Sequence, residues 1–258
     1  MKLSQLKIDP EFQSKIPPLQ FEEEQQLEQN IIAEGRLLNP IITWNGYILD
    51  GHTRYRILKK YGFIKFEVEE IQLANKYEAL AWICKNQLGR RNLSPERKKF
   101  LLGKEYESTK LAVGGQPGNC NKVNRCDQND HIDSEKRTCE RIAIEHGVWS
   151  ATVRRAEKYS RGIDAAEEAV PGAQEEILTG HIKATDEQIV ALASIPKEER
   201  PAILEELKKK KSDRDDTVLE RLKPNRPPPK QKSAPQKKKP TATENNTASQ
   251  AEQPETSV

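Results

Sequence analysis

The chain of 258 residues is long enough to bury a core of its own, so folding requires neither a metal ion nor disulfides. Charged residues make up 32% of the sequence and hydrophobic residues 34%, which is polar for a globular protein and predicts that part of the chain is disordered. The net charge of +3 is too small to indicate a polyanionic partner, so only local clusters of positive charge are informative. No apolar run reaches the length of a membrane span, and no apolar signal core follows Met1, which predicts a cytoplasmic protein without a membrane partner.

The first part of the chain alternates helical and strand patterns. Asn45-Gly46 separates two short apolar runs and favours a tight hairpin turn. In the helical pattern before it, Leu27, Ile31 and Ile32 are the expected buried positions. In chain order, we expect a helix over residues 21–34 ended by Gly35, a β-hairpin over 40–51, a helix over 52–61, a half-exposed strand over 64–71, a helix capped by Asn75 and ended by Gly89, and a helix begun by Ser94-Pro95 that ends near residue 111.

Residues 137–159 have the spacing of a helix-turn-helix, two helices joined by one tight turn. Ala143 on the first helix lacks the bulk that would keep a second helix from crossing closely. Gly147 lies where the chain must turn sharply and where positive φ is cheapest for glycine. Val153 and Ala156, three residues apart, turn one face of the second helix toward the core.

The opposite face of this second predicted helix is cationic. Arg154, Arg155 and Lys158 share it with Ala151, and such a surface suits the major groove of DNA, with its base edges and flanking phosphates. Ser150 is expected to cap the helix through its hydroxyl. The alternative is an ordinary helical hairpin with solvated charges. The candidate DNA-binding residues are Ser150, Thr152, Arg154, Arg155 and Lys158.

The remaining segments divide into a linker, further helices and a tail. Residues 112–136 lose periodicity and collect Gly, Asn, Asp and Pro, which predicts a flexible linker. Short helical patterns return after the predicted helix-turn-helix, one of them capped by Thr185, and we expect them to pack with it as one all-α domain over 137–211. Residues 212–258 are rich in proline and lysine and then in polar residues, which predicts a disordered tail that either attracts DNA weakly or only adds solubility.

Two segments of the first part could bind phosphate. The segment LDGHTRYR at residues 49–56 places Gly51 where a strand ends and a helix begins, so that backbone amides and the helix N-terminus can face an anion. Its two arginines add planar cationic groups suited to phosphate. The segment NQLGRRNLSPER at residues 86–97 places a glycine and two more arginines between two helices. Together they predict a phosphate-binding pocket.

A hairpin ending in Asp-Gly-His-Thr-Arg-Tyr-Arg, then Gly-Arg-Arg-Asn-Leu-Ser-Pro at 89–95, then a helix-turn-helix, resembles the ParB family of chromosome and plasmid partition proteins. The resemblance covers roughly residues 5–210, and the order of the motifs is more specific than any single motif. It implies an α+β fold: a ParB/sulfiredoxin-like α/β domain over 1–111, followed by the all-α domain. It also implies CTP binding with Mg²⁺, a homodimer on a palindromic double-stranded DNA site, a partner ATPase of the ParA type, and association with the nucleoid or a plasmid.

The family's binding segments can be carried over residue by residue. The Gly-Glu-Arg-Arg-aromatic-Arg segment falls on residues 51–56, where His52 and Thr53 replace an acid and a base. The Glu-Asn-x-x-Arg segment falls on residues 86–90, so Asn86 replaces the carboxylate that helps hold the metal. A neutral oxygen makes a weak magnesium ligand, which predicts at most weak CTP hydrolysis. By this resemblance the nucleotide-binding candidates are Gly51, His52, Thr53, Arg54, Arg56, Gly89, Arg90 and Arg91.

Two other classes of function remain open from the sequence. One is a nucleotide-dependent enzyme or nuclease in residues 1–111, with Asp50 and His52 as base or metal ligand. The other is a transcription regulator that is indifferent to nucleotide. Sulfiredoxin chemistry is excluded, because its thiolate nucleophile would have to stand where this chain has His52.

Overall fold

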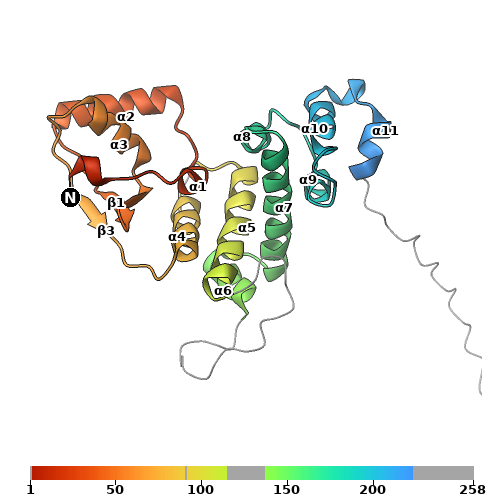
Figure 1. Cartoon of the computed structure of the whole chain (residues 1–258), viewed down its shortest axis with the longest axis horizontal. Helices are drawn as coiled ribbons and strands as arrows, with labels where there is room; N and C mark the ends of the chain where they lie inside the picture. Colours follow the sequence, from red (N-terminus) through yellow and green to blue (C-terminus); the bar gives the residue numbers. More distant parts are fainter. Residues whose placement is uncertain (1, 91, 115–136, 223–258) are drawn as a thin grey trace, which may run out of the picture. The chain divides into compact units, whose positions relative to one another are not determined.

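The computed structural model describes residues 2–90, 92–114 and 137–222, and within them the chain is a mixed α+β protein, as predicted (Figure 1). The first part contains η1 (Leu3–Gln5), α1 (Pro10–Gln13), α2 (Phe21–Glu34), β1 (Ile41–Trp44), β2 (Tyr47–Asp50), α3 (His52–Lys60), β3 (Val68–Glu70), α4 (Lys76–Leu88) and α5 (Pro95–Ala112). The second part contains α6 (Thr138–Glu145), α7 (Ser150–Ala169), α8 (Ala173–Leu178), α9 (Asp186–Leu192), α10 (Arg200–Lys208), η2 (Lys211–Asp213), α11 (Asp216–Leu219) and η3 (Glu220–Leu222). Among the described residues, none of these helices combines the length and hydropathy needed to cross a membrane.

A small three-stranded sheet positions the first candidate site. Its order is β2-β1-β3, with β1 antiparallel to β2 and parallel to β3. Asn45 and Gly46 make the predicted turn with φ of 49° and 77°, the left-handed region that these two residues tolerate. The third strand is shorter than the predicted strand over 64–71, because only Val68–Glu70 pair with β1. The hairpin ends at Asp50, directly before the start of α3.

The side chains of the hairpin reach two separate cores. Ile41 and Ile48 are fully buried and pack in one cluster with Ile31 of α2. Leu49 lies in a second cluster with Ile83 of α4. Because successive strand residues point to opposite faces, the four-residue strands of the hairpin can hold α2 and α3 on one side and α4 on the other.

The predicted helix over residues 21–34 is observed as α2, and Gly35 ends it with φ of 64°. Two of its three predicted buried positions face the core, Ile31 fully and Leu27 in part. Ile32 is 38% exposed, so that prediction is wrong. It follows Ile31 by one helical step of about 100°, which turns it to solvent.

The predicted caps of three helices are observed. Side-chain oxygens of Asn75, Ser94 and Thr185 accept hydrogen bonds from backbone N–H groups in the first turns of α4, α5 and α9. These helices therefore begin where the sequence places them.

The long helices α5 and α7 lie side by side and pack closely (Figure 1). A Cβ at Gly103 of α5 would overlap the carbonyl oxygen of Ala156 in α7 and lie 2.7 Å from Ser160 Oγ. Phe100 of α5 shares one buried core with Ile163 of α7 and with the helices that follow. Helix α5, which the sequence-based division places in the first domain, thus packs on the helices of the second.

The C-terminal helices extend past residue 211, the expected end of the helical domain. Leu219 and Leu222 are 9% and 2% exposed and join the core that contains Leu207 of α10. Residues 216–222, which the sequence assigns to the tail, therefore belong to the folded helices, because these leucines bury apolar surface that the short sequence pattern did not reveal. Residues 223–258, and residues 115–136 of the predicted linker, lie outside the described part of the chain.

Candidate functional site

Helices α6 and α7 are joined by a short turn at Gly147. Gly147 has φ of 64°, and the N–H of Val148 donates to the carbonyl of Ala143 at 2.9 Å, which closes the turn. The predicted core positions Val153 and Ala156 are fully buried and pack with Ala143 in one small cluster. The predicted bend and the predicted buried face of α7 are both present.

The start of α7 differs from the prediction at Ser150. The N-cap is Trp149, whose carbonyl accepts hydrogen bonds from the N–H groups of Thr152 and Val153 at 2.8 and 3.3 Å. Ser150 is already the first helical residue, and no side chain caps this end. The prediction that the Ser150 hydroxyl caps α7 is therefore wrong by one residue, because Trp149 adopts the extended backbone conformation of the cap. Ser150 and Thr152 are both partly buried at this end of the helix.

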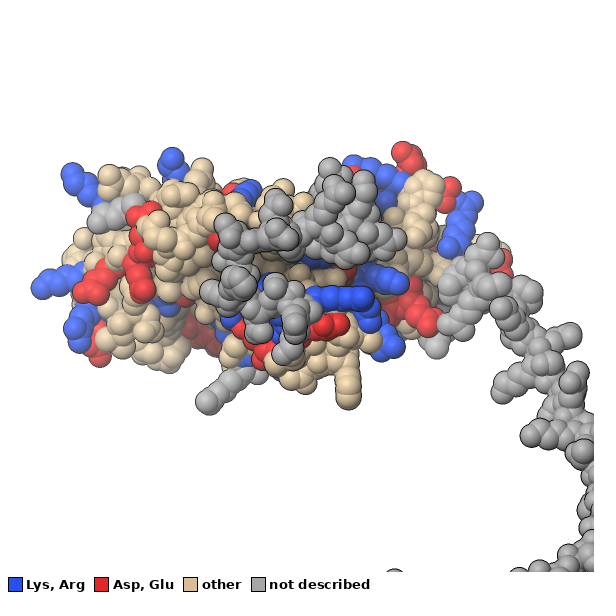
Figure 2. Space-filling view, turned by 90° about the horizontal axis from the view of Figure 1, so that it is seen from below, with Lys and Arg blue, Asp and Glu red and all other residues tan. Residues whose placement is uncertain are grey.

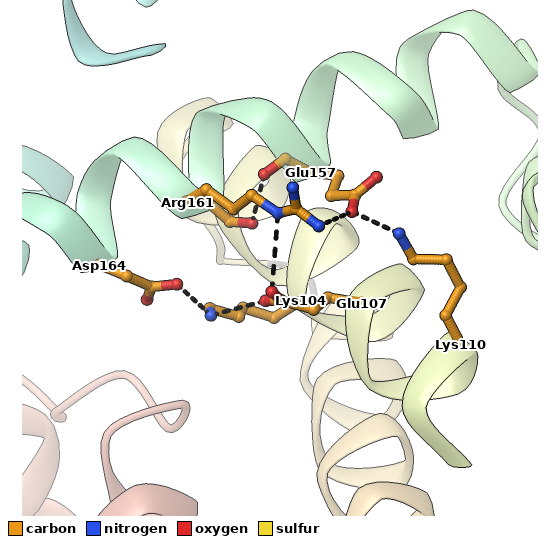
Figure 3. Close-up of polar contacts among 7 residues, drawn as sticks. Lys104, Glu107, Lys110, Glu157, Arg161 and Asp164 are labelled. Atoms are coloured by element: carbon orange, nitrogen blue, oxygen red, sulfur yellow. Dashed lines mark hydrogen bonds and ion pairs between the residues drawn. The ribbon is translucent and has the colours of Figure 1, made fainter. Parts of the chain in front are cut away.

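The charged side chains in the middle of α7, residues 154–164, divide into two groups. In the first, Glu157, Arg161 and Asp164 face α5 and form the network in Figure 3. Arg161 Nη2 lies 2.7 Å from Glu157 Oε1, and Arg161 Nε lies 3.7 Å from Glu107 Oε1. The ammonium of Lys104 pairs with Asp164. Burial opposes the charge of Lys104, yet the two carboxylates facing it, Asp164 and Glu107, outweigh burial and raise its pKa. These ions hold α7 against α5.

The second group is Arg154, Arg155 and Lys158, which are exposed. None of the three forms an ion pair or a side-chain hydrogen bond within the described residues. Residues 154, 155 and 158 fall within an arc of about 100° around the helix, because each residue advances by about 100° and position 158 lies between the other two. The face of the molecule in Figure 2 shows lysine and arginine side chains interspersed with acidic ones.

A histidine in the turn connects α6 and α7 to α5. His146 Nε2 lies 2.8 Å from Oε2 of Glu105, a carboxylate that is 3% exposed. This hydrogen bond raises the pKa of His146 above its ordinary value, although partial burial opposes the effect. Glu145 stands beside it and pairs with Lys85 of α4. The turn that sets the angle of α7 is thereby fixed on the neighbouring helices.

The second candidate site lies where β2 meets α3. Gly51 is the N-cap of α3, with φ of 99°, and a Cβ there would lie 3.0 Å from Arg54 Nη2. The carboxylate of Asp50 accepts from Arg54 Nη2 at 2.8 Å and from Arg90 Nη2 at 2.9 Å. Arg54 also donates to the carbonyl of Pro40 at 3.0 Å. One carboxylate thus brings together two arginines from segments far apart in the sequence.

Several polar atoms around this junction are buried without a partner. Both ring nitrogens of His52, the Nε of Arg54 and both amide atoms of Gln87 have no hydrogen-bond partner in the described structure. His52 is 7% exposed and Gln87 is fully buried. Burial lowers the pKa of His52 to about 4, although the Asp50 carboxylate opposes the shift. Polar atoms that are buried without a partner each cost about 1–3 kcal/mol of folding free energy.

The structure brings only some of the predicted nucleotide-binding residues together. Arg56 pairs instead with Glu24 of α2, at 3.1 Å, and donates to Thr53 Oγ1 at 3.5 Å. Gly89 has ordinary right-handed helical geometry, and it is exposed like Asn86, the predicted metal ligand. Arg91 lies outside the described residues.

Two residues in these sites were not anticipated. Gln87 falls on the position of the asparagine in the family's Glu-Asn-x-x-Arg segment, so the resemblance contained a signal for it. Trp149 is 83% exposed at the start of α7. Its position directly before the predicted recognition helix is the sequence feature that could have identified it.

Comparisons with known proteins place these sites in context. No protein-family model and no curated protein matches the chain. Solved structures similar to it include the following two. One is titled the C222₁ form of the Pnob8-like ParB-N domain, with 18% identity and a TM-score of 0.47, covering 81% of this chain and 83% of that chain. The other is a C-terminally truncated chromosome-partitioning protein ParB from Caulobacter crescentus, complexed to the centromeric parS site, with 17% identity and a TM-score of 0.34, covering 79% of this chain and 89% of that chain.

Proposed function

We propose that this chain is a site-specific double-stranded DNA-binding protein of the ParB type, and that α6, the Gly147 turn and α7 act as its helix-turn-helix. The observation that carries the proposal is the exposed, unpaired face of Arg154, Arg155 and Lys158. The other charged side chains in the middle of α7 form ion pairs within the fold, next to α5. The face with Arg154, Arg155 and Lys158 is therefore the part of the helix that can bind an anionic partner. Three cations on one face of a helix suit the phosphates and guanine edges of a major groove.

The oligomeric state follows from the reach of one helix. A single recognition helix reads too few base pairs to select one site in a genome, so the protein acts as a homodimer on an inverted repeat. Its biological role is partition or regulation of a chromosome, plasmid or mobile element, with a ParA-type ATPase as partner and a location on the nucleoid or plasmid.

A cytidine nucleotide is the proposed effector of the first domain. Gly51, Arg54 and Arg90 would hold its phosphates at the start of α3, and the unpartnered atoms of His52 and Gln87 would meet its polar groups. Bound there, the negatively charged triphosphate would compete with the Asp50 carboxylate for the arginines. The protein residues orient the ligand and exclude water from it.

Magnesium fits this site less well than phosphate. Asn86 offers one neutral, exposed oxygen, and the carboxylate of Asp50 is already engaged by two arginines. Among the described residues, the one cluster of three His or acidic ligand atoms is Glu105, Glu145 and His146, which includes neither Asn86 nor Asp50. We therefore propose nucleotide binding with at most weak hydrolysis.

A nuclease centred on Asp50 and His52 has less support. A general base must be free to take up the proton that it abstracts, whereas Asp50 is held in ion pairs with Arg54 and Arg90.

Genome-wide recovery of DNA bound to the full chain, with and without CTP, tests the proposal. A broad zone around an inverted repeat that appears only with CTP is the expected result for a nucleotide-gated clamp. One sharp peak that is unaffected by nucleotide would identify a simple regulator, and recovery without any enriched site would contradict site-specific binding.

A further inference from the structure

Trp149 is the most exposed large apolar side chain in the described part of the chain, with 83% of its surface accessible. The other two tryptophans are built into the fold. Trp44 donates its indole N–H to the carbonyl of Leu73 at 2.9 Å, and Trp82 packs partly buried on the cluster around Ile83. Tryptophan is rare on free surfaces and enriched where proteins bind partners, so its exposure here indicates a binding surface.

The backbone of Trp149 is held rigidly although its side chain is free. Its carbonyl accepts the first two hydrogen bonds of α7, and the turn at Gly147 directly precedes it. Within the described residues the indole makes no ring contact, cation contact or hydrogen bond. A large rigid side chain on a fixed backbone loses little entropy on binding, as an anchoring residue should.

Charge on the same helix indicates what the partner is. Arg154, Arg155 and Lys158 begin just over one turn after Trp149, and no described residue pairs with their charges, so a partner that covers this part of α7 would meet both positive charge and the indole. Duplex DNA offers a counterpart to each in its major groove. Phosphates line the groove, and the C5-methyl group of thymine is its apolar feature.

We propose that Trp149 contacts the C5-methyl group of a thymine in the bound duplex and thereby helps select the DNA sequence. The inference rests on the proposed function and deepens it, because the cations supply attraction to any duplex while the indole distinguishes one base. The contact removes both the methyl group and part of the indole from water. Burial of one methyl group strengthens binding about three- to fivefold.

Deoxyuridine provides the test, because it differs from thymidine only by lacking this methyl group. A preferred duplex is first selected with the full chain from a random pool, and each thymine in it is then replaced singly by deoxyuridine. For the wild type, we expect one replacement to weaken binding about three- to fivefold. Trp149→Ala should weaken binding to the thymine duplex by at least this factor and abolish the difference between thymine and uracil. Trp149→Phe should keep the difference.

Phe21→Ala is the matched control, because Phe21 is a 70% exposed aromatic residue at the start of α2. This variant should keep the full penalty for deoxyuridine. An equal penalty in the wild type and in Trp149→Ala would overturn the inference while leaving duplex binding intact. A change in sedimentation of DNA-free protein on Trp149→Ala would overturn it too, since the indole would then lie against a second protein chain. Absence of any duplex binding by the wild type would instead refute the proposed function itself.

Discussion

Gly103 of α5 lies directly against the backbone of Ala156 in α7, so that a methyl group on Gly103 would overlap the Ala156 carbonyl. A backbone carbonyl in a helix cannot move aside as a side chain can. We therefore expect Gly103→Ala to lower the free energy of unfolding by about 1 to 3 kcal/mol, measured by urea denaturation. Gly62→Ala is the control, because a Cβ there meets open space. Equal stability of the two variants would show that α5 and α7 do not pack this closely.

His146 predicts a pH dependence of stability in the turn before α7. Its pKa is raised in the folded state by the hydrogen bond to buried Glu105, with Glu145 reinforcing and Lys85 opposing the shift. Its contribution to folding is therefore complete below the unfolded pKa of about 6.5 and is lost as pH rises through the folded pKa. The difference in unfolding free energy between wild type and His146→Gln should be larger at pH 5.5 than at pH 8.5. A difference that grows with pH would contradict the bond to Glu105.

His52 predicts the opposite dependence. Its pKa falls to about 4 because it is buried, so the folded state favours the neutral ring. Above the unfolded pKa of about 6.5 the ring is neutral in both states and burial costs no deprotonation. As pH falls from 6.5 toward 4, the unfolded state alone takes up the proton, and the free energy of unfolding decreases. Relative to His52→Phe, the wild type should lose up to about 3 kcal/mol between pH 7.5 and pH 4.5 in urea denaturation. Parallel pH profiles would mean that the ring reaches water.

Removal of the Asp50 carboxylate should strengthen the binding of phosphate ligands. Asp50→Ala frees the guanidinium groups of Arg54 and Arg90, so CTP and inorganic tripolyphosphate should bind up to about fivefold more tightly in calorimetry. Arg54→Ala should weaken the same binding. Glu24→Ala frees the exposed Arg56 instead and serves as the control, with no expected change.

Two outcomes would count against this account of Asp50. Weaker binding to Asp50→Ala, in a variant whose thermal unfolding remains cooperative, would show that the carboxylate orders the arginines for the ligand. Unchanged binding in all three variants would place the phosphate site elsewhere. Asp50→Asn, which keeps the shape of the side chain, separates lost charge from lost packing.

Local features of the fold could be predicted from the sequence because their causes are local. Asn45-Gly46 forms its turn, and Asn75 and Ser94 cap their helices, through backbone conformations and hydrogen bonds within a few residues. Ser150 failed as a cap because the choice between neighbouring residues depends on one backbone angle, and Trp149 adopts the extended conformation.

The geometry of the candidate sites could not be predicted in full, because it depends on contacts between residues far apart in the sequence. Asp50 and Arg90 are 40 residues apart, and nothing in either motif indicates that one carboxylate neutralises arginines of both. Arg56 looked equivalent to Arg54 in the sequence, yet it pairs with Glu24 on another helix. The exposed cations of α7 were predictable, because the burial of Val153 and Ala156 fixes the orientation of the opposite face.

The salt dependence of duplex binding tests the central claim most directly. Each phosphate contact contributes about 0.9 to the slope of log affinity against log salt concentration. The variant that combines Arg154→Ala, Arg155→Ala and Lys158→Ala should therefore bind the selected duplex with a slope about 2 to 3 smaller than wild type. A variant with Arg36→Ala, Lys65→Ala and Lys183→Ala removes three exposed, unpaired charges elsewhere in the described chain and should keep the wild-type slope. Equal slopes for all three proteins would contradict the proposal that this face of α7 binds DNA.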